Sequence, residues 1–282
     1  MISELKSTNK FHKDAQWNIE YIEDIINKMF RKEELNWQPL SHIPKVQSNK
    51  HFPKFRRWVC DYLTYFHWVF KVKDQQTLYL AVQIMDLYLT KVKISKDKFQ
   101  LIASVWMLIA EKYEEIYPNP MDNYIKLAMN LFSKEDMKEM EHKILKRFSY
   151  KVEIYPTSFR FFNLFAKLLD LPKKEFNLGN FILHIWMFEV KTLDIQPSLQ
   201  GAAALIISKN MIQGKEPPYI TDNKEVKIML RNWNSYCQSR GDFKYSLDSA
   251  IIQLLEAFEY YLSHKSQYPR LNKKFKRTKE IK

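Results

Sequence analysis

The segment from Leu101 to Pro118, LIASVWMLIAEKYEEIYP, constrains the fold of this chain more than any other segment. Its first ten residues are apolar apart from Ser104, and they mix small and large side chains. Charged residues then begin at Glu111. A lysine at position 112 suits a helix end, because the last carbonyls lack partners and a cation is favoured at the negative end of the helix dipole. The segment therefore predicts a buried helix that ends shortly before Pro118.

The composition favours helices throughout. The chain has only four glycines among 282 residues, and its eleven prolines stand between apolar blocks. Few glycines disfavour β-rich folds and phosphate-binding loops, because both depend on glycine backbone conformations. Hydrophobic residues make up 46% and charged residues 27%, a typical globular balance. We therefore expect an all-α protein.

Apolar residues recur at helical spacing along most of the chain, and a capping box at Ser133 to Asp136 marks one helix start. The segments that show this pattern are 17–35, 54–69, 75–90, 96–113, 121–130, 134–149, 157–170, 175–190, 196–211, 223–238 and 246–263.

The helices divide into two blocks of about five, joined near Pro156, where the residue before proline favours an extended link. Small-residue helices begin at Phe99 in the first block and at Leu199 in the second, which suggests two copies of one fold. The predicted units are an N-terminal segment with one helix, two tandem five-helix bundles and a basic tail, over residues 1–53, 54–153, 154–264 and 265–282.

Two distant cysteines, Cys60 and Cys237, make neither a disulfide framework nor a metal cluster, so we expect a reducing, intracellular setting. The N-terminus lacks the apolar core of a signal peptide. The longest apolar run falls short of the roughly 20 residues needed to span a bilayer. These features predict a soluble protein without membrane contact.

The net charge is +13, and more than half of this excess lies between Lys265 and Lys282, which hold eight basic residues and one acidic residue. Such a tail fits a nuclear import signal, a nucleic-acid-binding arm or a solvated, disordered end. It lacks an apparent apolar stripe, so we expect it to be dispensable for folding. These alternatives are compatible with a protein that is located in the nucleus, in the cytoplasm or in both.

No pattern indicates catalysis. The chain has no HExxH, Walker or GxGxxG sequence, and its seven histidines show no ligand spacing. The adjacent Glu114 and Glu115 are expected to be solvated helix-end carboxylates, and His67 is expected to be a core histidine. We predict no enzyme activity, no cofactor and no metal.

Several motifs, in order and over most of the chain, resemble the cyclin family, and most closely its mitotic A/B-type members. In the first block these are Phe55 to Leu63 with Arg56 and Asp61, Thr77 to Leu89, Glu111 to Pro118, and Met140 to Leu145. Tyr155 to Phe159 and Gln196 to Ala204 resemble the second cyclin box. The resemblance implies two tandem cyclin folds, in which Arg56 and Asp61 have structural roles.

Cyclins bind a Ser/Thr protein kinase, move its αC helix inward and thereby order its activation loop. The resemblance assigns the main charged contacts to Lys112 and Glu141, which stand at the family's spacing of 29 residues. It assigns apolar kinase contacts to Tyr113, Leu145 and Tyr150, and to Tyr21 and Ile25 of the first helix. The expected partner is thus a cyclin-dependent protein kinase, for which this chain is a regulatory subunit in cell-cycle control.

A second site is implied where A-type cyclins bind substrate peptides with an Arg-x-Leu motif. Its possible apolar groove consists of Phe55, Trp58, Tyr62 and Gln100. Tyr65, however, occupies the position of the acidic residue that receives the peptide's arginine, so that charge-assisted hydrogen bond is lost. Glu111 likewise replaces the serine that the family usually has before Lys112.

Two alternatives remain open from the sequence. One is a nucleic-acid-binding transcription factor built from two cyclin folds, which would bind phosphates with its basic surface. The concentration of charge in the tail, and the presence of Lys112 and Glu141, make nucleic acid the less favoured partner. The other is a divergent cyclin that binds a partner without activating it.

Overall fold

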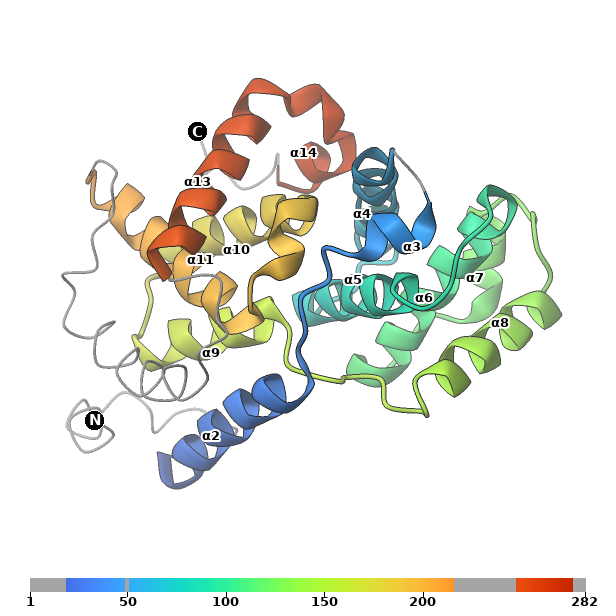
Figure 1. The fold of residues 1–282 in the computed structure, drawn as a ribbon, viewed down its shortest axis with the longest axis horizontal. Coiled ribbons are helices and arrows are strands. Elements are labelled where there is room, and N and C mark those ends of the chain that lie inside the picture. Colours follow the sequence, from blue (N-terminus) through green and yellow to red (C-terminus); the bar gives the residue numbers. More distant parts are fainter. Residues whose placement is uncertain (1–18, 49–50, 216–246, 276–282) are drawn as a thin grey trace.

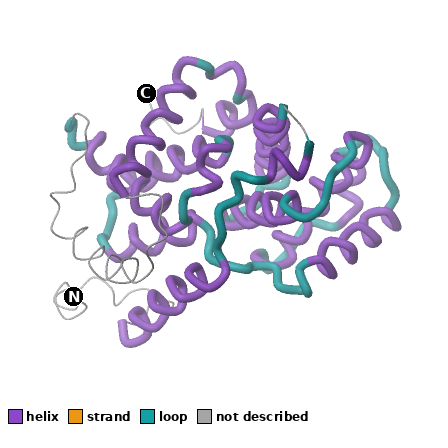
Figure 2. Tube along the Cα trace, in the orientation of Figure 1, coloured by secondary structure: helices purple, strands orange, loops and turns teal. Residues whose placement is uncertain are grey.

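The computed structural model describes residues 19–48, 51–215 and 247–275, and in these ranges every regular element is a helix (Figures 1 and 2). The described helices form two bundles that lie side by side in Figure 1, with the N-terminal helix α2 packed below the second bundle. The prediction of an all-α protein with two tandem helical bundles is confirmed.

The first bundle surrounds α6, which is the apolar segment singled out above. Helix α6 spans Phe99–Glu114, and its side chains from Ile102 to Glu111 are buried. The helices around it are α4 (Phe52–Val69), α5 (Gln75–Leu89), α7 (Met121–Leu127) and α8 (Lys134–Arg147). The predicted capping box is present at Ser133, where the hydroxyl accepts from the Asp136 amide at 3.0 Å.

The second bundle surrounds α11 (Pro197–Ile212), which is buried from Pro197 to Ser208 except at Gln200. Its described neighbours are α9 (Ser158–Leu168), α10 (Lys173–Met187) and α13 (Leu247–Ser263). Gly201 allows the close approach of α9, because a Cβ there would lie 2.7 Å from the Phe162 backbone nitrogen. The helix predicted over 223–238, with Cys237, lies outside the described residues.

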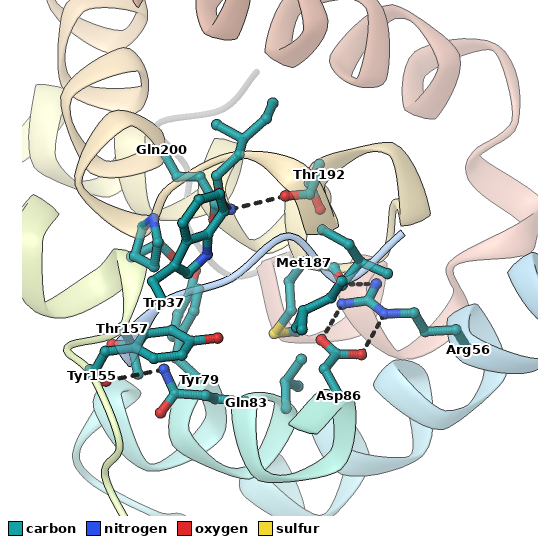
Figure 3. Close-up of a pocket in the computed structure, with 16 residues that line it drawn as sticks. Trp37, Arg56, Tyr79, Gln83, Asp86, Tyr155, Thr157, Met187, Thr192 and Gln200 are labelled. Carbon is teal, nitrogen blue, oxygen red and sulfur yellow. Dashed lines mark hydrogen bonds and ion pairs between the residues drawn. The ribbon is translucent and has the colours of Figure 1, made fainter. Parts of the chain in front are cut away.

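The two bundles meet through a polar interface (Figure 3). Arg56 of α4 is buried and forms two hydrogen bonds to Asp86 of α5, at 2.8 and 2.7 Å. The same guanidinium donates to the Met187 carbonyl of α10 at 2.7 Å. Gln83 of α5 donates to the Tyr155 carbonyl at 3.0 Å. Directional hydrogen bonds therefore fix the angle between the bundles, in addition to apolar packing.

Helix α2 (Ile19–Asn36) is anchored on the second bundle by a buried carboxylate. Glu33 accepts hydrogen bonds from the amide and the hydroxyl of Ser198, at 2.8 and 2.6 Å, in the first turn of α11. A carboxylate at this position satisfies free backbone donors and suits the positive end of the helix dipole. Phe30 adds an aromatic contact, with its ring centroid 5.3 Å from that of Phe161.

Replacing Glu33 with Gln should make the protein's stability less dependent on pH. Burial raises the pKa of Glu33 to about 7, and the two bonds from Ser198 oppose that rise. A raised folded-state pKa stabilises the fold at low pH, and this stabilisation is lost as the pH rises from 4.5 towards 7. Glu33→Gln should remove that loss, as measured by urea unfolding at several pH values. An unchanged pH profile in the variant would contradict the assignment.

The structure corrects the prediction for the chain after Lys265. Residues Lys265–Gln267 form a 3-10 turn, and Pro269–Phe275 form helix α14, which packs on α4. Tyr268 and Leu271 are fully buried. The prediction of a tail without an apolar stripe is therefore wrong for 265–275; residues 276–282 lie outside the described part.

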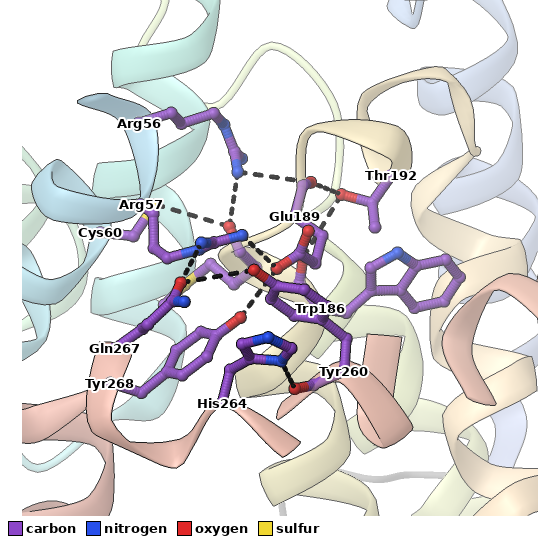
Figure 4. A network of polar contacts seen from close by, with 11 residues as sticks. Arg56, Arg57, Cys60, Trp186, Glu189, Thr192, Tyr260, His264, Gln267 and Tyr268 are labelled. Carbon is purple, nitrogen blue, oxygen red and sulfur yellow. Dashed lines mark hydrogen bonds and ion pairs between the residues drawn. The ribbon is translucent and has the colours of Figure 1, made fainter. Parts of the chain in front are cut away.

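The start of this segment joins a polar network between the bundles (Figure 4). Arg57 of α4 donates to Gln267 at 2.6 Å and to Glu189 at 3.1 Å. The Tyr268 hydroxyl donates to the same Glu189 oxygen at 2.9 Å. Residues 265–268 therefore belong to the folded body.

A second short helix, α3 (Ile43–Gln47), lies in the stretch between α2 and α4 that carried no helical prediction. Pro44 stands in its first turn, where proline needs no amide hydrogen and has a suitable φ angle. The Gln47 side-chain amide donates to the carbonyls of Leu89 and Val92, at 2.7 and 2.8 Å. Helix α3 thereby ties the connector to the end of α5.

Candidate partner-binding face

The end of α6 and the outer face of α8 bring Lys112 and Glu141 together. Lys112 Nζ donates to both carboxylate oxygens of Glu141, at 2.7 and 2.8 Å. The Lys112 side chain is 44% exposed and that of Glu141 is 14% exposed. The two residues thus form a preformed ion pair at the surface, although 28 residues separate them in the chain.

Exposed apolar side chains lie on the segments that carry this ion pair. Tyr113 and Tyr150 are about half exposed or more, and Leu145 is partly buried against the core. Ile116 and Tyr117, directly after α6, are more exposed than either tyrosine, at 86% and 90%. Neither Ile116 nor Tyr117 was among the predicted contacts, although both lie in the segment from Leu101 to Pro118. A surface that combines exposed aromatics with a few charges is typical of protein interfaces.

Tyr150 is held in a constrained turn after α8. Ser149 and Tyr150 have φ angles of 49° and 61°, in the left-handed region that side chains other than glycine seldom occupy. The Tyr150 amide donates to the Leu145 carbonyl at 2.8 Å, which closes the helix end as in a Schellman motif. The backbone therefore fixes the point from which the Tyr150 side chain, which is 61% exposed, leaves the turn.

Glu111 shapes the loop that carries Ile116 and Tyr117. Its side chain is fully buried, and one carboxylate oxygen accepts from the amide and the side chain of Asn119, at 2.8 and 3.0 Å. The serine that Glu111 replaces is too short to span this distance. The departure from the family pattern at position 111 thus has a local structural role.

Glu114 and Glu115 are not the solvated carboxylates that were expected. Glu114 forms an ion pair with Arg160 of α9 at 2.7 Å, and burial raises its pKa. Glu115 accepts from the Asp74 amide and the Thr77 hydroxyl, at 3.1 and 2.8 Å, and so binds the start of α5. The prediction failed because both carboxylates face neighbouring helices rather than water.

Two further kinase contacts, Tyr21 and Ile25, were expected from the first helix. Ile25 lies in α2 and is partly exposed, whereas the Tyr21 side chain lies outside the described set. Helix α2 is linked to α6 by charges: Lys32 pairs with Glu153 at 3.0 Å, Glu153 with Arg160 at 2.9 Å, and Arg160 with Glu114. This chain of ion pairs positions α2 relative to the end of α6.

The residues of the possible groove gather on α4 and the start of α6. The Trp58 ring lies 4.3 Å from that of Phe99 and 6.2 Å from that of Tyr62, and the Phe55 ring lies 5.3 Å from that of Phe99. Trp58 is 47% exposed, and Gln100 is the second residue of α6 and partly exposed. Phe55, Trp58 and Tyr62 thus cluster around the Phe99 ring, with Trp58 exposed and Tyr62 buried.

The far end of this possible groove is cationic. Arg270 of α14 pairs with Asp61 at 2.8 Å, and its guanidinium carbon lies 4.6 Å from the centre of the Tyr65 ring. An arginine of a docking peptide would meet this guanidinium rather than a free carboxylate. The structure also separates Arg56 from Asp61, because Arg56 binds Asp86 and the second bundle whereas Asp61 binds α14.

His67 is a core histidine, as expected, and its Nε2 lies 3.0 Å from the Asp74 carbonyl oxygen. Within residues 19–48, 51–215 and 247–275, no three His, Cys, Asp or Glu side chains are grouped so as to hold a metal ion. A search of the same ranges found no helix with the length and apolarity that a membrane span requires.

Both halves of the chain match models of one protein family. The model described as "Cyclin, N-terminal domain" matches residues 24–153, and "Cyclin, C-terminal domain" matches residues 156–279. The chain therefore belongs to the cyclin family.

Mitotic A/B-type cyclins are among the similar relatives. The chain is 29% identical to mouse G2/mitotic-specific cyclin-B3 over 84% of its own length and 17% of that protein. It is 33% identical to G2/mitotic-specific cyclin-A of Drosophila melanogaster over 49% of its length and 28% of that protein. These alignments span less than a third of either relative.

Solved structures agree on the fold. A viral cyclin from herpesvirus saimiri superposes with a TM-score of 0.65 and 17% identity, covering 84% of this chain and 99% of the viral one. A chain of the yeast RNA Pol II CTD kinase CTDK-1 complex gives 0.60 and 15%, covering 86% and 83%.

Proposed function

We propose that this chain is a regulatory subunit that binds and activates a cyclin-dependent Ser/Thr protein kinase, and that the kinase docks on the α6–α8 face. The observation that carries this proposal is the Lys112–Glu141 ion pair at the surface, together with exposed Tyr113, Ile116, Tyr117 and Tyr150 at the ends of α6 and α8. Membership of the cyclin family supports it, as does the likeness to a chain of a kinase complex.

The ion pair suits a role in binding better than a role in stability. An exposed pair contributes roughly 0–1 kcal/mol to folding, because water screens it and its long side chains must be ordered. When a partner covers the face, the same charges are desolvated. Truncating one member of an interfacial charge network then costs roughly 2–5 kcal/mol, because the charges left behind are unpaired.

Lys112→Ala and Glu141→Ala should therefore each weaken kinase binding by a factor of at least about thirty, which corresponds to roughly 2 kcal/mol. The free protein should unfold at nearly the same urea concentration as the wild type. The measurement uses purified chain and a panel of purified cyclin-dependent kinases, with calorimetry for binding and phosphate transfer to a Ser/Thr peptide for activation.

Lys143 and Glu139 provide the matched control, because they form an exposed ion pair on the same helix. Lys143→Ala and Glu139→Ala should leave binding and activation unchanged. Binding without phosphate transfer would indicate a non-activating cyclin. If no kinase binds and duplex DNA or RNA does, with an affinity that falls as salt rises, the nucleic-acid alternative replaces the proposal.

A further inference from the structure

Lys274 of α14 lies among neutral bases at the junction of the two bundles. Its Nζ is 2.9 Å from His184 Nε2 of α10 and 3.5 Å from His67 Nδ1 of α4, and it donates to Gln75 Oε1 of α5 at 2.8 Å. Both imidazoles are buried, with exposed fractions of 3% for His67 and 0% for His184. One amine thereby links helices of both bundles to the end of the described chain.

The backbone determines which nitrogen of each imidazole faces the lysine as an acceptor. His184 Nδ1 lies 3.0 Å from the Asn180 carbonyl oxygen and also 3.0 Å from the Tyr79 hydroxyl, which can accept as well as donate. His67 Nε2 lies 3.0 Å from the Asp74 carbonyl oxygen. A carbonyl oxygen can only accept, so these nitrogens carry the protons. The opposite nitrogens therefore present lone pairs to Lys274, and both rings are neutral. With Gln75 Oε1 they offer three acceptors, which match the three N–H bonds of an ammonium group.

We propose that this cluster is a proton-sensitive clasp, which holds α14 against both bundles and releases it when His67 or His184 is protonated. A protonated ring would donate where it now accepts, and it would place a second positive charge beside the amine. Release would also separate Arg270 from Asp61, because Arg270 lies on the same helix.

The direction of the pH effect follows from burial. Burial, together with the positive charge of Lys274, lowers the pKa of both histidines well below 6.5. The released state takes up protons as the pH falls below 6.5, whereas the docked state does not, so acid favours release by up to about tenfold per pH unit for each ring. Burial also lowers the pKa of Lys274 to about 7, from 10.5, which further favours release as the pH falls through that range.

Other charged and titratable groups also face α14. Asp61 of α4 pairs with Arg270, Tyr79 of α5 contacts His184, and Tyr261 of α13 binds Asn272. On α14 itself, Lys273 lies over the exposed Trp68 ring at 4.3 Å, away from the imidazoles. Asp61 is a carboxyl at this contact, and burial raises its pKa. A raised pKa favours docking as the pH falls, so protonation of Asp61 opposes the release caused by the histidines.

Hydrogen–deuterium exchange of the full chain tests the clasp. After correction for intrinsic exchange, amide protection of 270–275 should fall at least about tenfold between about pH 7.5 and 5.5, whereas protection in α5 and α6 should persist. The double variant His67→Asn, His184→Gln keeps a hydrogen-bond acceptor for Lys274 near the position of each imidazole lone pair. Its Asn and Gln side chains, unlike the imidazoles, cannot be protonated. Its protection of 270–275 should fall much less than that of the wild type over this range, because the contribution of the histidines is removed and that of Lys274 remains.

Lys273→Met serves as the control on the same helix, and it should keep the acid sensitivity of the wild type. NMR titration of the wild-type imidazoles gives a readout that needs no folded variant: the rings of His67 and His184 should protonate together with the loss of α14 protection. Constant protection of α14 in the wild type would overturn the proposal. Equal acid sensitivity in the double variant would overturn it as well and would assign the effect to Lys274 rather than to the histidines. These outcomes do not depend on kinase binding.

Discussion

Arg56→Ala should lower the free energy of unfolding by roughly 3–5 kcal/mol, because it leaves the buried Asp86 carboxylate without a partner. Arg56 forms two hydrogen bonds to Asp86 and one to the Met187 carbonyl, so its loss affects both bundles. Urea unfolding followed by circular dichroism measures the change. The loss should appear as a lower unfolding midpoint, and premature separation of the bundles would also reduce the cooperativity of unfolding.

The exposed pair of Lys134 and Asp122, 3.4 Å apart, supplies the comparison. Lys134→Ala should change the stability by less than about 1 kcal/mol. If Arg56→Ala has an equally small effect, water reaches Asp86 in the variant and the interface is not held by this ion pair.

Leu271→Ala should have the second large effect and lower the stability of α14 docking by roughly 2–5 kcal/mol, the cost of removing a buried leucine side chain. Leu271 is fully buried where α14 packs on α4. The loss should appear as faster amide exchange in 268–275 and, if α14 unfolds together with the bundles, as a lower urea midpoint.

Lys273→Ala is the suitable control, because Lys273 is exposed on the same helix. Lys273→Ala removes the contact with the Trp68 ring, but it should leave amide exchange in 268–275 nearly unchanged. Wild-type stability and exchange in the Leu271→Ala variant would restore the expectation that this segment is dispensable for folding.

Most helices of the described chain could be predicted from periodicity, because long amphipathic or apolar segments such as 99–114 leave few other choices. The helix predictions failed only in short segments, at α3 and around α14. Helix α3 is only five residues long and begins next to a proline, so it is too short to show a helical period in the sequence. Around α14 the high lysine content made an apolar stripe hard to recognise; it consists of Tyr268, just before the helix, and of Leu271 and Phe275 within it.

Part of the candidate site could be predicted from the sequence. Resemblance could select Lys112 and Glu141, but it could not show that they bind each other, because that contact depends on how α6 packs on α8. The ion-pair partners of Glu114 and Arg270 could not be predicted from the sequence for the same reason, because they lie on helices that are distant in sequence. Long-range contacts of this kind are set by tertiary packing, which local patterns do not encode.

The left-handed turn at Ser149 and Tyr150 has a consequence for the kinetics of complex formation. Its backbone strain, of order 1–3 kcal/mol per residue, is offset by folding of the free chain and not by binding. A partner that meets the Tyr150 ring therefore loses little affinity to loop ordering. We expect association at this face to resemble rigid-body docking, with a rate limited by diffusion and orientation, and affinity changes among variants to appear mainly in the dissociation rate.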